Sequence, residues 1–140
     1  MAIAAQFPKL GILDLSFTNT TTQTLASVAL ATTINELYLE GVTVRDDGLA
    51  SIEPLKTLTA IAIRGDKVTH NGIKHLSKNT ALEYIYIDDL TFTSEMIAPL
   101  KSLTNLKALW LRGSKATRSD MRAAKKALPK CDVEFFVKRK

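Results

Sequence analysis

Cysteine is almost absent from this chain of 140 residues, in which Cys131 is the only one. A single cysteine excludes an intramolecular disulfide framework and suits a reducing compartment. No apolar run approaches the roughly 20 residues that a membrane-spanning helix needs. The opening residues MAIAAQFPKL (1–10) lack the charged start and the apolar stretch of a signal peptide. These absences predict a soluble cytoplasmic domain without membrane insertion.

Residues that bind metals or attack substrates are also scarce. The only histidines, His70 and His75, are five positions apart, whereas a metal-binding pair on a helix prefers a spacing of three or four. A catalytic thiol needs a histidine partner, and Cys131 is distant from both in sequence. No phosphate-binding G-x-x-x-x-G-K-[ST] motif occurs, and the aspartate pairs at 46–47 and 88–89 lack calcium-loop spacing. We therefore expect no enzyme activity, no cofactor and no metal site.

Charge is divided unevenly along the chain. Residues 1–100 contain 7 Lys/Arg and 11 Asp/Glu, a net charge of −4. Residues 101–140 contain 12 Lys/Arg and 3 Asp/Glu, a net charge of +9. This polarity requires an explanation in terms of either solubility or an anionic partner.

A period of 24 residues organises the chain from Leu10 onward. Three aliphatic columns recur at this spacing: Leu10, Ile34, Leu58, Leu82 and Leu106; Leu13, Leu37, Ile61, Ile85 and Leu109; and Leu15, Leu39, Ile63, Ile87 and Leu111. One further period places Val133 and Phe135 in the second and third columns. No insertion or deletion interrupts the register, and such constancy indicates a repeat protein.

Each 24-residue row predicts a strand, a turn and a helix. The pattern L-x-x-L-x-L is a short strand whose aliphatic side chains point inward. A column of possible helix-capping threonines follows the turn, with Arg45 as the exception: Thr21, Thr69, Thr93 and Thr117. One row cannot bury its apolar side alone, so stacked rows must share a continuous core.

These rows resemble leucine-rich repeats of the bacterial, planctomycete-like type, which has about 24 residues per repeat and is related to the cysteine-containing and ribonuclease-inhibitor-like types. The segment INELYLEGVTVRDDGLASIEPL (34–55) matches the form L-x-x-L-x-L-x-x-[T/N]-x-V-T-D-x-G-L best, and KKALPKCDVEF (125–135) is similar to a terminal repeat. The resemblance covers residues 10 to 136. It implies an α/β solenoid: a short right-handed arc with about six parallel strands on its concave face and helices on its convex face.

The repeat map divides the chain into three parts. Residues 1–9 form an N-terminal cap or the remnant of a preceding repeat, in which Ile3 and Phe7 would cover the first repeat. Residues 10–129 hold five 24-residue leucine-rich repeats, and residues 130–140 form a C-terminal capping strand and a basic tail.

Alternation along the strands sends three other columns outward, onto the concave face. They are Ile12, Glu36, Ala60, Tyr84, Ala108 and Asp132; Asp14, Tyr38, Ala62, Tyr86, Trp110 and Glu134; and Ser16, Glu40, Arg64, Asp88, Arg112 and Phe136. These 18 positions of 140 hold all three tyrosines and the only tryptophan, residue types that are enriched at binding hot spots. Strand packing alone would also favour aromatics here, but it would not explain why tyrosine and tryptophan are absent elsewhere.

We expect Tyr84, Tyr86 and Trp110 to form one platform, with a shallow dip over Ala60 and Ala62. Within the third column the charges of Glu40, Arg64, Asp88 and Arg112 alternate in sign from strand to strand. Opposite charges on adjacent strands stabilise a sheet by roughly 0.2–1 kcal/mol per pair. A partner could also bind these charges. The candidate partner-binding residues are Tyr38, Tyr84, Tyr86, Trp110, Glu36, Arg64, Asp88 and Arg112.

The basic end of the chain has two interpretations. Its candidate residues are Lys115, Arg118, Arg122, Lys125, Lys126 and Lys130, and Lys-Arg-Lys follows at 138–140. A lysine-rich terminal repeat keeps the end of a solenoid soluble and resists edge-to-edge pairing. Alternatively, these side chains bind a polyanion such as nucleic acid.

The sequence therefore favours a non-catalytic scaffold that binds an unidentified protein or peptide through the concave sheet. One alternative is binding of nucleic acid or another polyanion through the basic C-terminal repeat. Another is a purely structural segment of a larger repeat array. The first interpretation also predicts a monomer unless the chain is part of a longer array.

Overall fold

The computed structural model describes residue 6 and residues 8–137. The predicted cap contacts of Ile3 and Phe7, and the basic residues 138–140, lie outside the described residues. The boundaries predicted at residues 9/10 and 129/130 remain predictions.

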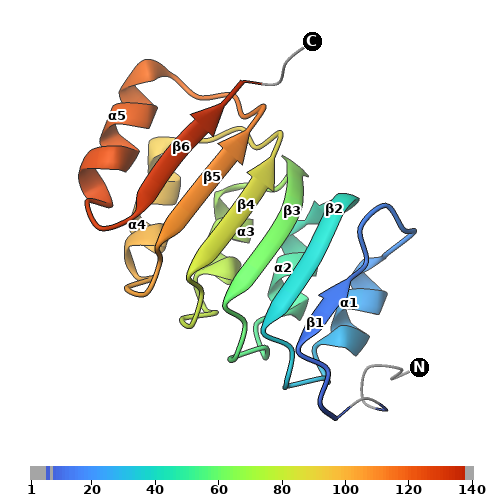
Figure 1. Ribbon diagram of the computed structural model, residues 1–140. Coiled ribbons are helices and arrows are strands. Elements are labelled where there is room, and N and C mark those ends of the chain that lie inside the picture. Colours follow the sequence, from blue (N-terminus) through green and yellow to red (C-terminus); the bar gives the residue numbers. More distant parts are fainter. Residues whose placement is uncertain (1–5, 7, 138–140) are drawn as a thin grey trace.

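Six parallel strands form one sheet in the order of the sequence (Figure 1). They are β1 (Ile12–Asp14), β2 (Glu36–Arg45), β3 (Ala60–Lys67), β4 (Tyr84–Asp88), β5 (Ala108–Arg112) and β6 (Asp132–Phe136). Each strand is joined to the next through a helical segment, and these segments stack along one face of the sheet. The opposite face of the sheet is called the concave face below. This arrangement confirms the predicted α/β solenoid.

Short helices follow the strands, as the threonine column predicts. They are α1 (Thr22–Val28), α2 (Asp46–Ser51), α3 (His70–Leu76), η2 (Ser94–Met96), α4 (Ile97–Lys101) and α5 (Arg118–Ala127). Thr21, Thr69 and Thr117 accept hydrogen bonds from backbone N–H groups of the first helical turn, whereas Thr93 and Arg45 make no such bond. Among the described residues, no helix combines the length and the apolar character needed to cross a bilayer.

The aliphatic columns form the core between the sheet and the helices. Leu37, Ile61 and Ile85 are fully buried, and Leu109 is only 1% exposed. Burying each such side chain contributes about 1.5–3 kcal/mol relative to leaving it in water. Because the same columns continue from repeat to repeat, the core is continuous along the solenoid.

Polar contacts also join successive repeats. The Asp46 carboxylate at the start of α2 accepts hydrogen bonds from the backbone N–H and the hydroxyl of Thr69, the N-cap of α3. The fully buried Asn79 amide donates to the carbonyl oxygens of Ile52 and Leu55 in the preceding repeat, each at 3.0 Å. The two Asn79 bonds satisfy an amide NH₂ group and carbonyl oxygens in the buried interior, whereas the Asp46–Thr69 bonds are exposed.

The strand register follows the 24-residue period except in the second half of β2, where it shifts twice. Tyr38 pairs with Ala62, Ala62 with Tyr86, and Tyr86 with Trp110. In β2, however, the register shifts after Leu39, so Thr43 rather than Glu40 lies opposite Arg64. The backbone of Gly41 has a φ of 70°, a conformation that glycine adopts readily. The predicted cross-strand neighbourhood of Glu40 and Arg64 is therefore wrong.

Candidate functional site

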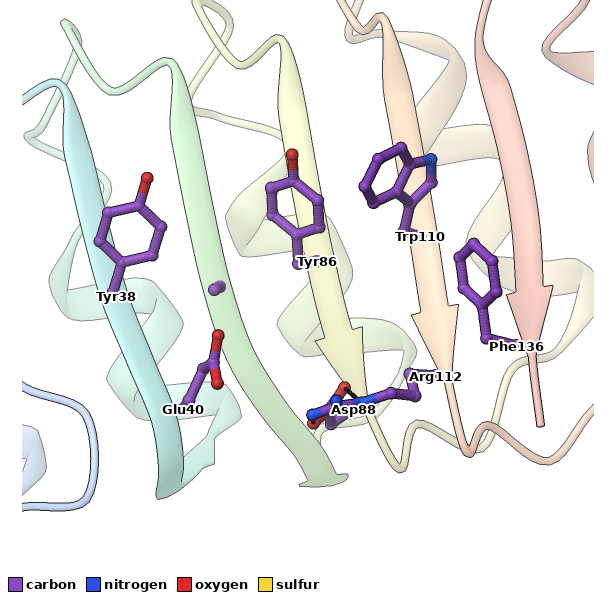
Figure 2. A pocket seen from close by; sticks show the side chains of 8 residues that line it. Tyr38, Glu40, Tyr86, Asp88, Trp110, Arg112 and Phe136 are labelled. Carbon is purple, nitrogen blue, oxygen red and sulfur yellow. Dashed lines mark hydrogen bonds and ion pairs between the residues drawn. The ribbon is translucent and has the colours of Figure 1, made fainter. Parts of the chain in front are cut away.

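A pocket of about 370 Å³ lies on the concave face and crosses five strands, from β2 to β6 (Figure 2). Its lining residues are Tyr38, Glu40, Ala62, Tyr86, Asp88, Trp110, Arg112 and Phe136. The repeat places them together although they span about a hundred positions of the chain, because residues 24 apart become neighbours on adjacent strands. The pocket lies on the predicted concave surface, and of the two alanines expected beneath the dip Ala62 lines it whereas Ala60 does not.

Three aromatic rings form one wall of the pocket. The Tyr86 and Trp110 ring centroids are 5.1 Å apart with an interplanar angle of 74°, and those of Trp110 and Phe136 are 6.0 Å apart with an angle of 83°. Edge-to-face contacts of this kind contribute about 0.5–1.5 kcal/mol beyond area burial. The Trp110 indole N–H also donates to Asp132 Oδ2 at 3.0 Å. Trp110 is therefore held in place while remaining 37% exposed.

Tyr38 stands on the other side of the pocket. Its hydroxyl donates to Glu36 Oε2 at 2.6 Å, and this hydrogen bond raises the pKa of Tyr38 to about 12. Ala62 pairs with Tyr38 on one side and with Tyr86 on the other and is 3% exposed, so only a methyl group separates the two tyrosines across the sheet. The small residue leaves the space that the larger ones enclose.

Charged side chains occupy one end of the pocket. Arg112 Nε donates to Asp88 Oδ1 at 3.0 Å, and a second bond joins Arg112 to Asp88 Oδ2. The Asp88 carboxylate raises the pKa of Arg112. Arg64 does not complete the predicted charge ladder; its Nε lies 3.3 Å from Asp66 and 3.7 Å from Asp89.

Five of the eight candidate residues line the pocket, and three lie outside it. Glu36 contacts the pocket only through Tyr38, and Arg64 lines a neighbouring depression near Glu40. Tyr84 lies beneath the Lys107 ammonium, which is 5.8 Å from its ring centroid. The expected platform of Tyr84, Tyr86 and Trp110 is thus replaced around the pocket by Tyr86, Trp110 and Phe136.

Sequence reasoning omitted Glu40 and Phe136 from the candidate residues, although both stand in its third outward column. The predicted site rested on tyrosine and tryptophan, although phenylalanine offers the same kind of aromatic ring. The net charge of the face was a further signal, since the outward columns contain six acidic residues and two basic ones, a net charge of −4. The acidic residues are Asp14, Glu36, Glu40, Asp88, Asp132 and Glu134, and the basic ones are Arg64 and Arg112.

The basic candidate residues lie in and around α5, and none of them lines the pocket. Four of them belong to α5, and all six are exposed: Lys115, Arg118, Arg122, Lys125, Lys126 and Lys130. Lys125 is held 3.3 Å from Glu134, and Arg122 donates to the carbonyl oxygen of Arg118. Within residues 114–130 there are six basic residues and one acidic residue, a net charge of +5.

His75 and Cys131 have ordinary structural surroundings, whereas Nδ1 of His70 is buried without a hydrogen-bond partner among the described residues. His75 Nδ1 lies 2.6 Å from Glu53 Oε1, and no group of three or more potential metal ligands occurs among the described residues. Cys131 packs against the core, and burial raises the pKa of its thiol to about 11. A thiol with a raised pKa is a poor nucleophile near neutral pH.

Comparison with known proteins bears on the fold. No family model matches the chain, and no curated protein matches it. Among solved structures, a leucine-rich-repeat protein of Leptospira interrogans matches with a TM-score of 0.70 and 21% sequence identity. The match covers 96% of this chain. The chain has a leucine-rich-repeat fold.

The leucine-rich-repeat fold is what this likeness establishes, because sequence identity of 21% does not carry function across. This leucine-rich-repeat chain spans about a third of the Leptospira protein, 33% of its length. The planctomycete-like repeat type remains a prediction.

Proposed function

We propose that this leucine-rich-repeat chain is a non-catalytic scaffold that binds a protein or peptide through its concave face. The observation that carries the proposal is the pocket, in which tyrosine, tryptophan and phenylalanine side chains from four strands meet. Such aromatic side chains supply large contact areas at little cost in conformational entropy. The sequence of the chain places no tyrosine or tryptophan anywhere else except Tyr84, which is on the same face.

A random peptide library displayed on phage tests this function. We expect wild-type protein to enrich peptides whose affinity falls at least about 30-fold, or about 2 kcal/mol, for Tyr86→Ala/Trp110→Ala. Ala62→Leu should also weaken binding, since it fills the pocket and removes no aromatic ring. Circular dichroism melts would show that both proteins remain folded.

Arg122→Gln/Lys126→Gln on α5 is the matched control and should leave peptide affinity unchanged. Peptides that bind wild type and both pocket variants equally would contradict the proposed site. Failure to enrich any peptide would favour a purely structural segment of a larger array.

A second candidate function, polyanion binding, is supported by the exposed basic side chains of α5. It has one observation against it. Sites for single-stranded nucleic acid interleave cations with stacking aromatics, whereas here the aromatics lie on the acidic sheet and the basic residues mostly on α5.

Titration with single-stranded DNA at increasing salt tests this second function. If α5 binds phosphates, Arg122→Gln/Lys125→Gln/Lys126→Gln should reduce the slope of log affinity against log salt by about 2, at about 0.7 per lost contact. Tyr86→Ala/Trp110→Ala should leave the slope unchanged. A slope that is the same in wild type and in the α5 variant would exclude α5 as the binding surface.

A further inference from the structure

We infer that the concave pocket accepts a basic side chain of the partner, and arginine in preference to lysine. This inference rests on the proposed function, because it names the chemistry of what the pocket binds. It follows from the shape of the pocket, from the charge that its residues leave unpaired, and from the charge of the surrounding face.

The shape suits one long side chain. Tyr38 and Tyr86 are on strands two positions apart in the sheet, a separation of about 9.6 Å, and Ala62 between them is small. Figure 2 shows both tyrosine hydroxyls pointing away from the end where Glu40 and Asp88 lie. The pocket therefore has an aromatic middle and an acidic end, which matches a side chain with an apolar stem and a cationic tip.

The unpaired charge is that of Glu40. Its side chain is exposed, and its carboxylate makes no hydrogen bond or ion pair with any residue that the structure describes, although its charge acts at longer range on Arg112 and helps to raise the pKa of that guanidinium. Asp88, by contrast, is already bonded to Arg112 through both carboxylate oxygens. Among the pocket residues the charges of Asp88 and Arg112 cancel, and the net charge is −1. An anionic ligand would meet an Arg112 whose charge Asp88 already neutralises and would be repelled by Glu40, whereas a cation can bind Glu40 directly.

The hollow on the concave face continues beyond Tyr38 and Glu40, where aromatic and acidic side chains again line it. A second hollow of about 490 Å³ shares Tyr38 and Glu40 with the first and adds Asp14, Ser16 and Phe17. Hydrogen bonding to Ser16 lowers the pKa of Asp14, so this carboxylate stays ionised over a wider pH range. A bound peptide that crosses the strands from β4 toward β1 would thus pass two carboxylates, about one repeat apart.

Charge complementarity extends over the whole face. The outward columns carry a net charge of −4, or −3 once the ion pair of Glu134 with Lys125 is included, on a chain whose total is +5. A face that opposes the sign of the whole molecule selects and steers a basic segment and disfavours an acidic one. Arginine suits the site better than lysine, because its planar guanidinium stacks on aromatic rings and can bind a carboxylate through two hydrogen bonds.

The test uses peptides selected on wild-type protein from the phage library, with Trp110 fluorescence as the readout. Trp110 is the only tryptophan of the chain and lines the pocket, so its emission reports on this site. We expect the selected peptides to share an arginine. Replacing it with glutamine should lower affinity about tenfold or more, and replacing it with lysine should lower affinity less.

The decisive comparison is a double-mutant cycle between the peptide arginine and Glu40→Gln. If the two groups contact each other, the arginine-to-glutamine change should cost at least about fivefold less on Glu40→Gln than on wild type. Glu95→Gln is the control, because it removes an equal charge from an exposed residue of η2. On Glu95→Gln, replacing the peptide arginine with glutamine should lower affinity by the same factor as on wild type.

Selected peptides that depend on Tyr86 and Trp110 but share no basic residue would overturn this inference and leave the scaffold function intact. Peptides that bind independently of both aromatics would overturn both. Self-association of the protein that disappears both in Glu40→Gln and in Arg122→Gln/Lys126→Gln would identify α5 of a second copy as the occupant, and would overturn the assignment to a separate partner.

Discussion

The concave pocket takes its side chains from five strands between Tyr38 and Phe136, whereas the basic surface around α5 comes from residues 114–130 alone. The two surfaces also differ in sign and in content, since one is acidic and aromatic and the other is basic and lacks aromatic residues. A surface built from one helix depends mainly on the packing of that helix in the last repeat, because ten residues are too few for a stable isolated helix. The pocket requires every repeat from the second to the last to be in register, so its integrity should depend on the core of the whole solenoid.

The largest effect should come from the core directly beneath the pocket. Ile85 is fully buried between Tyr84 and Tyr86 on β4. We expect Ile85→Ala to lower the free energy of unfolding by about 2–5 kcal/mol, because it removes core contacts and leaves a cavity. Tyr84→Ala, on the outward face of the same strand, should cost less than about 1 kcal/mol. Urea unfolding of both variants measures the difference, and equal costs would contradict the assignment of the two faces.

A smaller effect should come from the cap of α5. Thr117 Oγ1 accepts a hydrogen bond of 3.0 Å from the Asp120 backbone N–H. Thr117→Ala should therefore lower stability by about 1 kcal/mol, within a range of about 0.5–2. The matched control is Thr93→Ala at the N-cap of η2, where no side-chain capping bond exists. Thermal unfolding compares the two, and a cost at Thr93 equal to that at Thr117 would contradict the capping explanation.

The smallest effect concerns the ionisation of the Tyr38 hydroxyl at the edge of the pocket. Hydrogen bonding to Glu36 raises the pKa of Tyr38 from its ordinary value of 10.0 to about 12. Between these values the unfolded state loses the proton that the folded state keeps, so the contribution of this group to stability is full below pH 10 and is lost as pH rises toward 12. Glu36→Gln should bring the pKa of Tyr38 down.

Phenolate absorbance during an alkaline titration measures this shift. Tyr38→Phe identifies the step that belongs to Tyr38. Superimposable curves for wild type and Glu36→Gln would show that the carboxylate does not control this proton.

The sequence predicted the strands, their order and the neighbours Tyr38, Ala62, Tyr86 and Trp110, because an uninterrupted 24-residue period fixes which residues lie side by side. It could not predict where the backbone departs from that period. The register shift at Gly41 moves Glu40 away from Arg64. The apolar columns give no sign of this shift, because Leu39 still points inward and is fully buried.

The 24-residue period also could not predict which charged side chains form ion pairs with each other. Arg64 lies between several carboxylates and pairs with Asp66 and Asp89, a choice that depends on local backbone geometry after the strand. The acidic excess of the concave face is different, because the outward columns already contained it. The negative charge of this face was predictable from the sequence, because it depends only on which residues occupy the outward columns.

The repeat fixes the width of the pocket in units of one strand. Tyr38 and Tyr86 are two strand spacings apart because one repeat, that of Ala62, lies between them. Loss of that repeat would bring the two tyrosines within one spacing of about 4.8 Å, and its duplication would separate them by three. A solenoid of this kind can thus change the size of ligand that it admits only in discrete steps, whereas a pocket between loops can change gradually.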